Sequence, residues 1–166
     1  MSYKILVLED IIENQDAAKK GLSPFGEVII ASNYKEGVEL LEKYNPDLAF
    51  VDVNFPYDED SKIQELGHSF IDNYLNSKIV PYAIVTSYDH RGNEDTLIDM
   101  NIPRIKTSLG FSLEENITRS VGSGHSKKSP NTWENAYINL MSIDLETEIA
   151  TKIYIDALKI HRELLV

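Results

Sequence analysis

One apolar stretch that carries a single carboxylate constrains the fold of this chain more than any other feature. From Leu48 to Val53 every residue except Asp52 is apolar, without the alternation of a half-exposed strand. Such a run is typical of a central strand in a parallel sheet that helices cover on both faces. Because an unpaired buried charge is very unfavourable, Asp52 fits only at the carboxyl end of the strand, where open α/β sheets place their sites. Taken alone, Asp52 would be better explained as a cap of the following loop.

Composition narrows the class of protein. The 166 residues suit one domain with an appendage, and the net charge of −11 argues against nonspecific binding to nucleic acid or anionic membranes. The absence of cysteine excludes disulfides, zinc thiolates and a thiol nucleophile. No signal-peptide core and no long apolar span occurs. We therefore expect a cytoplasmic protein that binds neither nucleic acid nor a membrane directly.

Short apolar runs alternate with helical patterns along the first two thirds of the chain. This order implies right-handed crossovers and an α/β fold, a doubly wound five-stranded parallel sheet of the flavodoxin-like type. The predicted strands are Ile5–Leu8, Glu27–Ala31, Leu48–Val53, Ala83–Ser87 and Arg104–Thr107. The helices predicted between them cover residues 12–21, 33–45, 67–80 and, more loosely, 95–100, with a polar acidic surface loop at 57–62.

The pattern changes after Phe111. A capping box at residues 112–115 predicts a short helix to about Val121, and residues 122–130 have the composition of a mobile linker. Helices are then expected at 132–142 and 144–165, so we divide the chain into 1–121 and a helical extension, 122–166. One stripe of the last helix either packs on its own domain or forms a homodimer interface. Its residues are Ile149, Ile153, Ala157, Ile160 and Leu164.

Polar residues of particular kinds stand at four predicted strand ends. They are Glu9 and Asp10, Asp52, Thr86 with Ser87, and Lys106. Carboxyl ends of parallel strands share one edge of a sheet, so these side chains can converge. Each has an ordinary explanation by itself, as a cap, a turn or a solvated lysine, but one shared site explains all four together.

The charges of such a site favour a divalent cation. Two unit charges about 4 Å apart repel by roughly 4 kcal/mol at an effective dielectric constant of about 20. Three converging carboxylates exceed what one lysine offsets, and an oxygen-only ligand set suits Mg²⁺. A carboxylate held by Mg²⁺ beside a lysine and a hydroxyl can attack phosphorus, with those groups stabilising charge on the transferring oxygens.

Over about residues 3–121 the sequence resembles the receiver domain of two-component response regulators. The resemblance is carried by several blocks in the same order as in that family. They are Ile5–Asp10, Pro46–Pro56, Val85–Ser87, Lys106 and Phe111–Glu115. It implies a part in phosphorelay signal transduction, with a histidine kinase or phosphotransfer protein as the partner.

The resemblance also implies roles for individual residues. Asp52 would accept a phosphoryl group from a phosphohistidine, Thr86 would donate a hydrogen bond to a phosphoryl oxygen, and Lys106 would pair with another. Mg²⁺ would be held by Asp10 directly, by Glu9 largely through water, by Asp52 and by the backbone carbonyl of Asn54. Catalysis would be confined to phosphorylation and dephosphorylation of Asp52 itself.

The chain departs from the family around the lysine. Lys106 is followed by Thr107 where proline is usual, and Pro103 stands where an aromatic residue reports phosphorylation. These departures bear on output more than on phosphoryl chemistry, and they leave open a pseudo-receiver that binds partners without being phosphorylated. A phosphatase of the haloacid dehalogenase type is a weaker alternative, because Asn54 stands where its general acid would be and Asp52 follows the third strand.

Overall fold

The computed structural model describes residues 2–78, 80–88, 95–101, 116–120, 127–141 and 148–164. Its strands are β1 (Tyr3–Leu8), β2 (Gly26–Ala31), β3 (Leu48–Val51), β4 (Asn54–Pro56), β5 (Ile63–Glu65), β6 (Tyr82–Tyr88), β7 (Asp95–Asn101) and β8 (Asn116–Ser120). Its helices are α1 (Ile12–Leu22), α2 (Tyr34–Tyr44), α3 (Gly67–Phe70), α4 (Pro130–Met141) and α5 (Glu148–Leu164). A 3-10 turn, Ser23–Phe25, follows α1, and a π-helical turn, Ile71–Leu75, continues α3.

The main sheet has the strand order β2-β1-β3-β6-β7-β8. Its first four strands are parallel, and helices cover both faces, so the predicted α/β class with a parallel central sheet is confirmed. The far edge differs from the prediction, because β7 pairs antiparallel with β6 and β8 pairs antiparallel with β7. The described residues therefore form four parallel strands extended by an antiparallel pair. The predicted fifth strand, Arg104–Thr107, lies outside the described residues.

Two helix predictions at this edge were wrong. Residues 95–100, expected as a loose helix, belong to β7, and residues 116–120, expected to follow the capping box as helix, form β8. The weak helical pattern of residues 95–100 is overridden by pairing, because β7 hydrogen-bonds along the whole of β6. Residues 112–115, the capping box itself, lie outside the described part.

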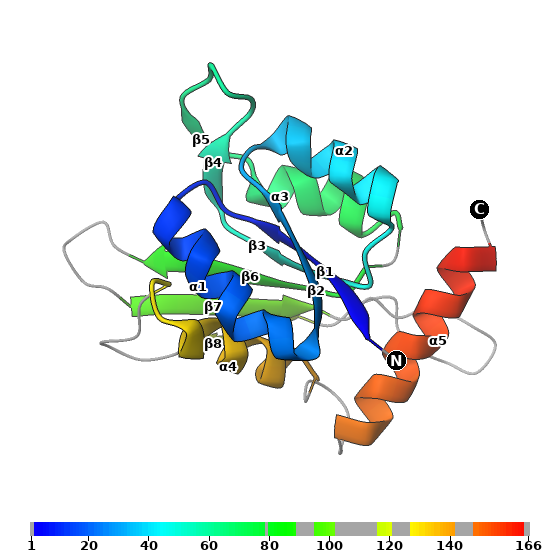
Figure 1. Cartoon of the computed structure of the whole chain (residues 1–166). Coiled ribbons are helices and arrows are strands. Elements are labelled where there is room, and N and C mark those ends of the chain that lie inside the picture. Colours follow the sequence, from blue (N-terminus) through cyan, green and yellow to red (C-terminus); the bar gives the residue numbers. More distant parts are fainter. Residues whose placement is uncertain are drawn as a thin grey trace.

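Alternation along the parallel strands divides the core into two layers. Ile5 and Val7 of β1 face one apolar cluster, whereas Leu6 and Leu8 face the other. Helices α1 and α4 cover the first face, and α2 and α3 cover the second (Figure 1). Trp133 of α4 is fully buried in the same cluster as Ile5. Helix α4, which was predicted to belong to the C-terminal extension, shares this core. The predicted domain boundary between residues 121 and 122 stays a prediction.

Helix α5 lies beside the start of β1, at the amino end of the sheet (Figure 1). Over residues 155–164, where the side chains are described, the buried ones are Ile155, Leu158 and Arg162. In the predicted stripe, by contrast, Ile160 is 53% and Leu164 79% exposed, and Ala157 is also exposed. The prediction that this stripe packs on its own domain is therefore wrong for these three residues. The side chains of Ile149 and Ile153 lie outside the described part.

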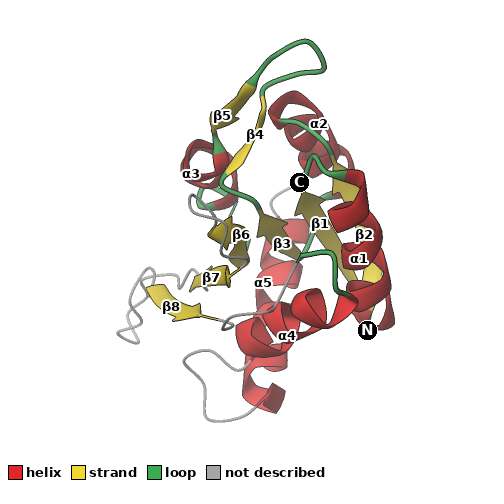
Figure 2. Cartoon of the chain, turned by 90° about the vertical axis from the view of Figure 1, so that its left-hand side faces the viewer, coloured by secondary structure: helices red, strands yellow, loops and turns green. Residues whose placement is uncertain are grey.

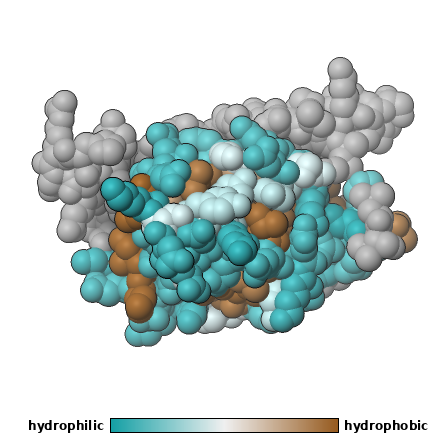
Figure 3. Space-filling model, turned by 90° about the horizontal axis from the view of Figure 1, so that it is seen from above, coloured by the Kyte–Doolittle hydropathy of each residue, from teal (hydrophilic) through white to brown (hydrophobic). Residues whose placement is uncertain are grey.

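A short antiparallel hairpin, β4 with β5, interrupts the usual strand-to-helix connection after β3 and projects from the body (Figure 2). The acidic residues predicted as a surface loop form its tip. The molecular face viewed from above is mostly hydrophilic, with scattered apolar spots (Figure 3). Among the described residues, no helix combines the length and apolarity needed to cross a membrane.

Candidate functional site

The carboxyl ends of β1 and β3 bring three carboxylates together. Leu8 and Val51 are partners in the parallel register, and the Asp52 amide donates to the Leu8 carbonyl at 3.1 Å. The residues that follow these strands, Glu9, Asp10 and Asp52, therefore stand at the same level. Each offers a carboxylate oxygen, and these oxygens all lie within 4.8 Å of one another. The predicted convergence of these three residues is confirmed, and their chemical roles stay predictions.

A lysine closes this cluster, and it is Lys127. Its ammonium lies 2.8 Å from Asp52 Oδ2, 3.0 Å from Glu9 Oε2 and 3.4 Å from the Val85 carbonyl oxygen. Lys127 is 3% exposed and Asp52 7%, while Glu9 is completely buried. An ion pair so far from solvent is weakly screened, so each charge depends strongly on its partners.

Lys127 was missed because residues 122–130 have linker composition. In the structure, residues 127–129 form the turn that leads into α4, and Pro130 opens that helix. The sequence does carry a signal: a lysine shortly before a helix that begins with proline, a residue favoured at the first helical position. The antiparallel strands β7 and β8 come between β6 and this turn, so Lys127 stands later in the chain than the predicted Lys106.

The structure describes the other predicted site residues only in part. Lys106 lies outside the described residues. The backbone of Thr86 is in β6, opposite Leu97, but its side chain lies outside the described part. Asn54 is the first residue of β4 and pairs with Glu65.

The hairpin leaves the Asn54 carbonyl turned away from β5. The Val53 carbonyl accepts from the Leu66 amide at 3.1 Å, which makes Val53 and Leu66 a hydrogen-bonded pair. Hydrogen-bonded and non-hydrogen-bonded pairs alternate along an antiparallel ladder, so Asn54 and Glu65 form a non-hydrogen-bonded pair. The ladder therefore does not use the Asn54 carbonyl, which keeps it available as a ligand.

Glu9 is enclosed by hydrogen-bond donors. Its Oε1 accepts from Asn14 Nδ2 and its Oε2 from Lys127, while its backbone carbonyl accepts from Gln15 Nε2 at 2.7 Å. Burial nevertheless raises the pKa of Glu9 to about 8, with Lys127 opposing and Asp52 adding to the increase. Burial also raises the pKa of Asp10. The site thus holds carboxyl groups whose ionisation is disfavoured by their surroundings.

The ligand set fits a hard divalent cation. Asp52 Oδ1 accepts from the Val53 amide at 2.7 Å, and Oδ2 accepts from Lys127, so each oxygen has one donor and retains a further lone pair. Asp10 is only half-buried and has an open side. Three carboxylates face one described lysine, so a cation would remove repulsion. Asp10 and Asp52 are the direct ligands that this arrangement offers, and Glu9 is held back by its donors.

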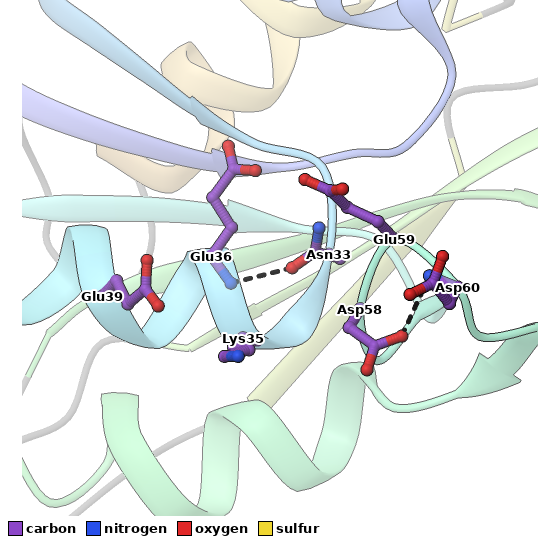
Figure 4. A pocket seen from close by; sticks show the side chains of 7 residues that line it. All are labelled: Asn33, Lys35, Glu36, Glu39, Asp58, Glu59 and Asp60. Atoms are coloured by element: carbon purple, nitrogen blue, oxygen red, sulfur yellow. Dashed lines mark hydrogen bonds between the residues drawn. The ribbon is translucent and has the colours of Figure 1, made fainter.

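A hollow of about 360 Å³ lies between α2 and the hairpin (Figure 4). It is lined by Asn33, Lys35, Glu36, Glu39, Asp58, Glu59 and Asp60. Asn33 caps α2 by accepting from the Glu36 amide at 2.8 Å, and Asp58 accepts from Ser61 at 2.6 Å, so part of this polarity serves local turns. Its carboxylates are not buried against a lysine, and the cluster at the strand ends is the stronger candidate for chemistry.

Comparison with known proteins gives little further identification. No protein-family model and no curated protein matches the chain. Among solved structures, it is similar to a mutant of the anti-anti-sigma factor PhyR from Bartonella quintana, with 18% identity and a TM-score of 0.43. The match covers 53% of this chain and 35% of that chain. The fold class follows from the parallel order β2-β1-β3-β6 and the helices on both faces.

Proposed function

We propose that this chain is a phospho-acceptor receiver in phosphorelay signalling, with Asp52 as the acceptor. The observation that carries the proposal is the buried contact of 2.8 Å between Lys127 and Asp52 within a cluster of three carboxylates. That set of groups at the ends of neighbouring parallel strands supports attack on phosphorus. Lys127 takes the role that the sequence resemblance gave to Lys106.

The proposed step needs only groups that the site contains and a phosphorylated donor. An oxygen of the Asp52 carboxylate attacks the phosphorus of a phosphohistidine. An O–P bond forms, the P–N bond breaks, and the electron pair leaves with the imidazole, which takes up a proton. Lys127, already in contact with Asp52, stabilises negative charge on a transferring oxygen. The phosphoryl group is transferred to Asp52, so the chain modifies its own side chain.

Mg²⁺ is the cofactor proposed for this site. Asp10, Asp52 and the Asn54 carbonyl would hold it, with Glu9 behind them. When bound, it supplies positive charge that offsets the oxygens of the phosphoryl group. The residues present meet its preference for oxygen ligands.

The test is intact-protein mass after incubation with acetyl phosphate and Mg²⁺. Wild type should gain the mass of one phosphoryl group, and Asp52→Asn should gain none, because the amide is no nucleophile. Lys127→Met should slow labelling by about tenfold or more, the order expected for losing one charge-stabilising group. Lys106→Met is the matched control and should label like wild type. Equal labelling of wild type and Asp52→Asn would exclude Asp52 as the acceptor.

One observation favours a second candidate, a pseudo-receiver that binds partners without being phosphorylated. Lys127 already bridges Glu9 and Asp52, so the buried charges have partners without any phosphoryl group. Under this alternative the ionic cluster is structural, and no variant would take up a phosphoryl group. A histidine kinase or phosphotransfer protein, a homodimer through the C-terminal helices and a cytoplasmic location remain parts of the main proposal.

A further inference from the structure

Trp133 is attached directly to the lysine of the site. Its indole Nε1 donates a hydrogen bond of 2.8 Å to the backbone carbonyl of Lys127, six residues earlier in the chain. The indole is fully buried, and it is the sole tryptophan of the sequence. The bond therefore lies in the apolar layer between α1, α4 and the sheet, away from competing water.

The turn that carries Lys127 is also held where α4 begins. The Thr132 amide donates to the Ser129 carbonyl at 3.1 Å, which closes the start of α4, but this bond does not reach Lys127. The Lys127 side chain is long and rotatable, so its ammonium is fixed only if its backbone is fixed. The indole bond acts directly on that backbone, because its acceptor is the Lys127 carbonyl itself.

Helix α4 itself forms a firm support. A side chain at Gly21 of α1 would place its Cβ 2.3 Å from the Pro130 carbonyl oxygen and 3.1 Å from Trp133 Cβ. The two helices thus approach so closely that only glycine fits at this point. Because α1 begins directly after the acidic strand end, one rigid unit connects the carboxylates to the indole.

We propose that Trp133 is a positioning residue that holds the Lys127 ammonium between Glu9 and Asp52. The proposal rests on the proposed function for its effect on phosphoryl transfer, and on geometry alone for its effect on Lys127. A buried indole needs an acceptor in any protein. A purely structural role, however, predicts that the loss of its N–H group affects all of α4 and not the lysine in particular.

The first test measures Lys127 without reference to phosphorylation. Limited acylation with an amine-selective succinimidyl ester, read by peptide mass spectrometry, gives the modification of Lys127 relative to its exposed neighbour Lys128. Trp133→Phe keeps a ring but removes the donor, and should raise this ratio about fivefold, the population change expected from losing one hydrogen bond. Leu140→Ala, a fully buried position on the same helix, is the control for weakened packing and should leave the ratio within about twofold.

The second test measures the rate of phosphoryl labelling by acetyl phosphate at a temperature where both variants are folded. Trp133→Phe should slow labelling by at most about fivefold, because only molecules with a misplaced lysine lose its charge, and Leu140→Ala should not slow it. If wild type takes up no phosphoryl group, the proposed function fails while the acylation ratio still decides the role of Trp133. An unchanged ratio in Trp133→Phe, or an equal rise in Leu140→Ala, overturns the positioning role.

Discussion

The two ends of the parallel sheet both bury carboxylates, but they neutralise them differently. At the carboxyl end, Glu9, Asp10 and Asp52 share one described lysine, Lys127. At the amino end, Asp47 alone is paired with two cations of α5, Lys159 and Arg162. In the sequence, Asp47 and Asp52 stand at the two ends of the same apolar strand, Leu48–Val51. Charge balance, and not burial, separates the two ends.

At the amino end, both oxygens of the Asp47 carboxylate accept hydrogen bonds. Asp47 Oδ2 accepts from the Lys4 amide at 2.9 Å and from Lys159 at 3.1 Å, and Oδ1 accepts from Arg162 at 3.1 Å. Burial lowers the pKa of Arg162 and Asp47 opposes that change, so the two charges depend on each other. Nearby, burial and Asp156 raise the pKa of Tyr3. This end fastens α5 to the start of β1 and β3.

The comparison teaches how to separate structural from functional carboxylates. A buried carboxylate whose oxygens are all paired with cations contributes to stability only as long as those partners remain. A cluster with more carboxylates than cations is held together at a cost in stability, and that cost is expected where a ligand supplies the missing charge. The acidic cluster at the carboxyl end is of the second kind.

The largest expected effect comes from removing one carboxylate at each end. Asp47→Asn leaves Arg162 buried without its counterion and should lower the free energy of unfolding by about 3–5 kcal/mol. Asp10→Asn relieves repulsion, and without Mg²⁺ it should leave stability unchanged or raise it. Urea unfolding in the presence of EDTA measures both. Equal losses for the two variants would mean that the ends do not differ in charge balance.

The next largest effect is the pH dependence of stability, which we expect from Glu9 at the carboxyl end. The pKa of Glu9 in the folded protein, about 8, lies above its ordinary value of 4.5, so the folded state holds this proton more tightly. Its stabilising contribution is complete below pH 4.5 and is lost as the pH rises through 8. In Mg²⁺-free buffer, Glu9 should therefore lower stability with rising pH by at most about 1.4 kcal/mol per pH unit.

Glu9→Gln cannot ionise and is the comparison for this slope. Urea titration at several pH values measures the unfolding free energy of wild type and of Glu9→Gln. As the pH rises, wild type should lose stability relative to Glu9→Gln. A difference that stays constant from pH 4.5 to 8 would contradict the raised pKa.

A smaller effect is expected from Mg²⁺, which should stabilise only the carboxyl end. At about ten times its dissociation constant, a ligand that binds only the folded state adds about 1.4 kcal/mol. Thermal melting with and without Mg²⁺ should show this gain in wild type and in a less drastic amino-end variant, Lys159→Met. Asp10→Asn should lose most of the gain. A gain of the same size in Asp10→Asn would place the cation elsewhere.

Sequence reasoning located the carboxylates because local patterns determine them. The apolar runs of β1 and β3 end at fixed residues, and parallel pairing then brings Glu9, Asp10 and Asp52 to one edge. Likewise, the helix predicted over residues 33–45 is observed as α2, and the Asn33 side chain caps it by accepting from the Glu36 amide.

The parts that were missed depend on contacts distant in sequence. Residues 95–101 form a strand because β6 offers an edge to pair with, and no local signal encodes that choice. Lys127 contacts Glu9 across 118 positions and Asp52 across 75. The buried face of α5 includes Arg162 because this side chain binds Asp47 at the amino end of the sheet. The sequence prediction considered only apolar residues of α5 and therefore selected a different face of the helix.

The smallest expected effect concerns Lys128, the neighbour of Lys127. Lys128 pairs with Glu13 at 3.4 Å, but the two side chains are 64% and 70% exposed, so water screens their attraction. Such surface pairs contribute about 0–1 kcal/mol, and Lys128→Met should change the free energy of unfolding by no more than that. It should also leave the rate of labelling by acetyl phosphate unchanged, whereas Lys127→Met slows it. The two variants remove the same charge from adjacent positions, which makes them a matched pair for urea unfolding and mass spectrometry. If Lys128→Met slowed labelling as much as Lys127→Met, general charge near the acidic cluster would explain the effect, and direct contact with Asp52 would not be needed.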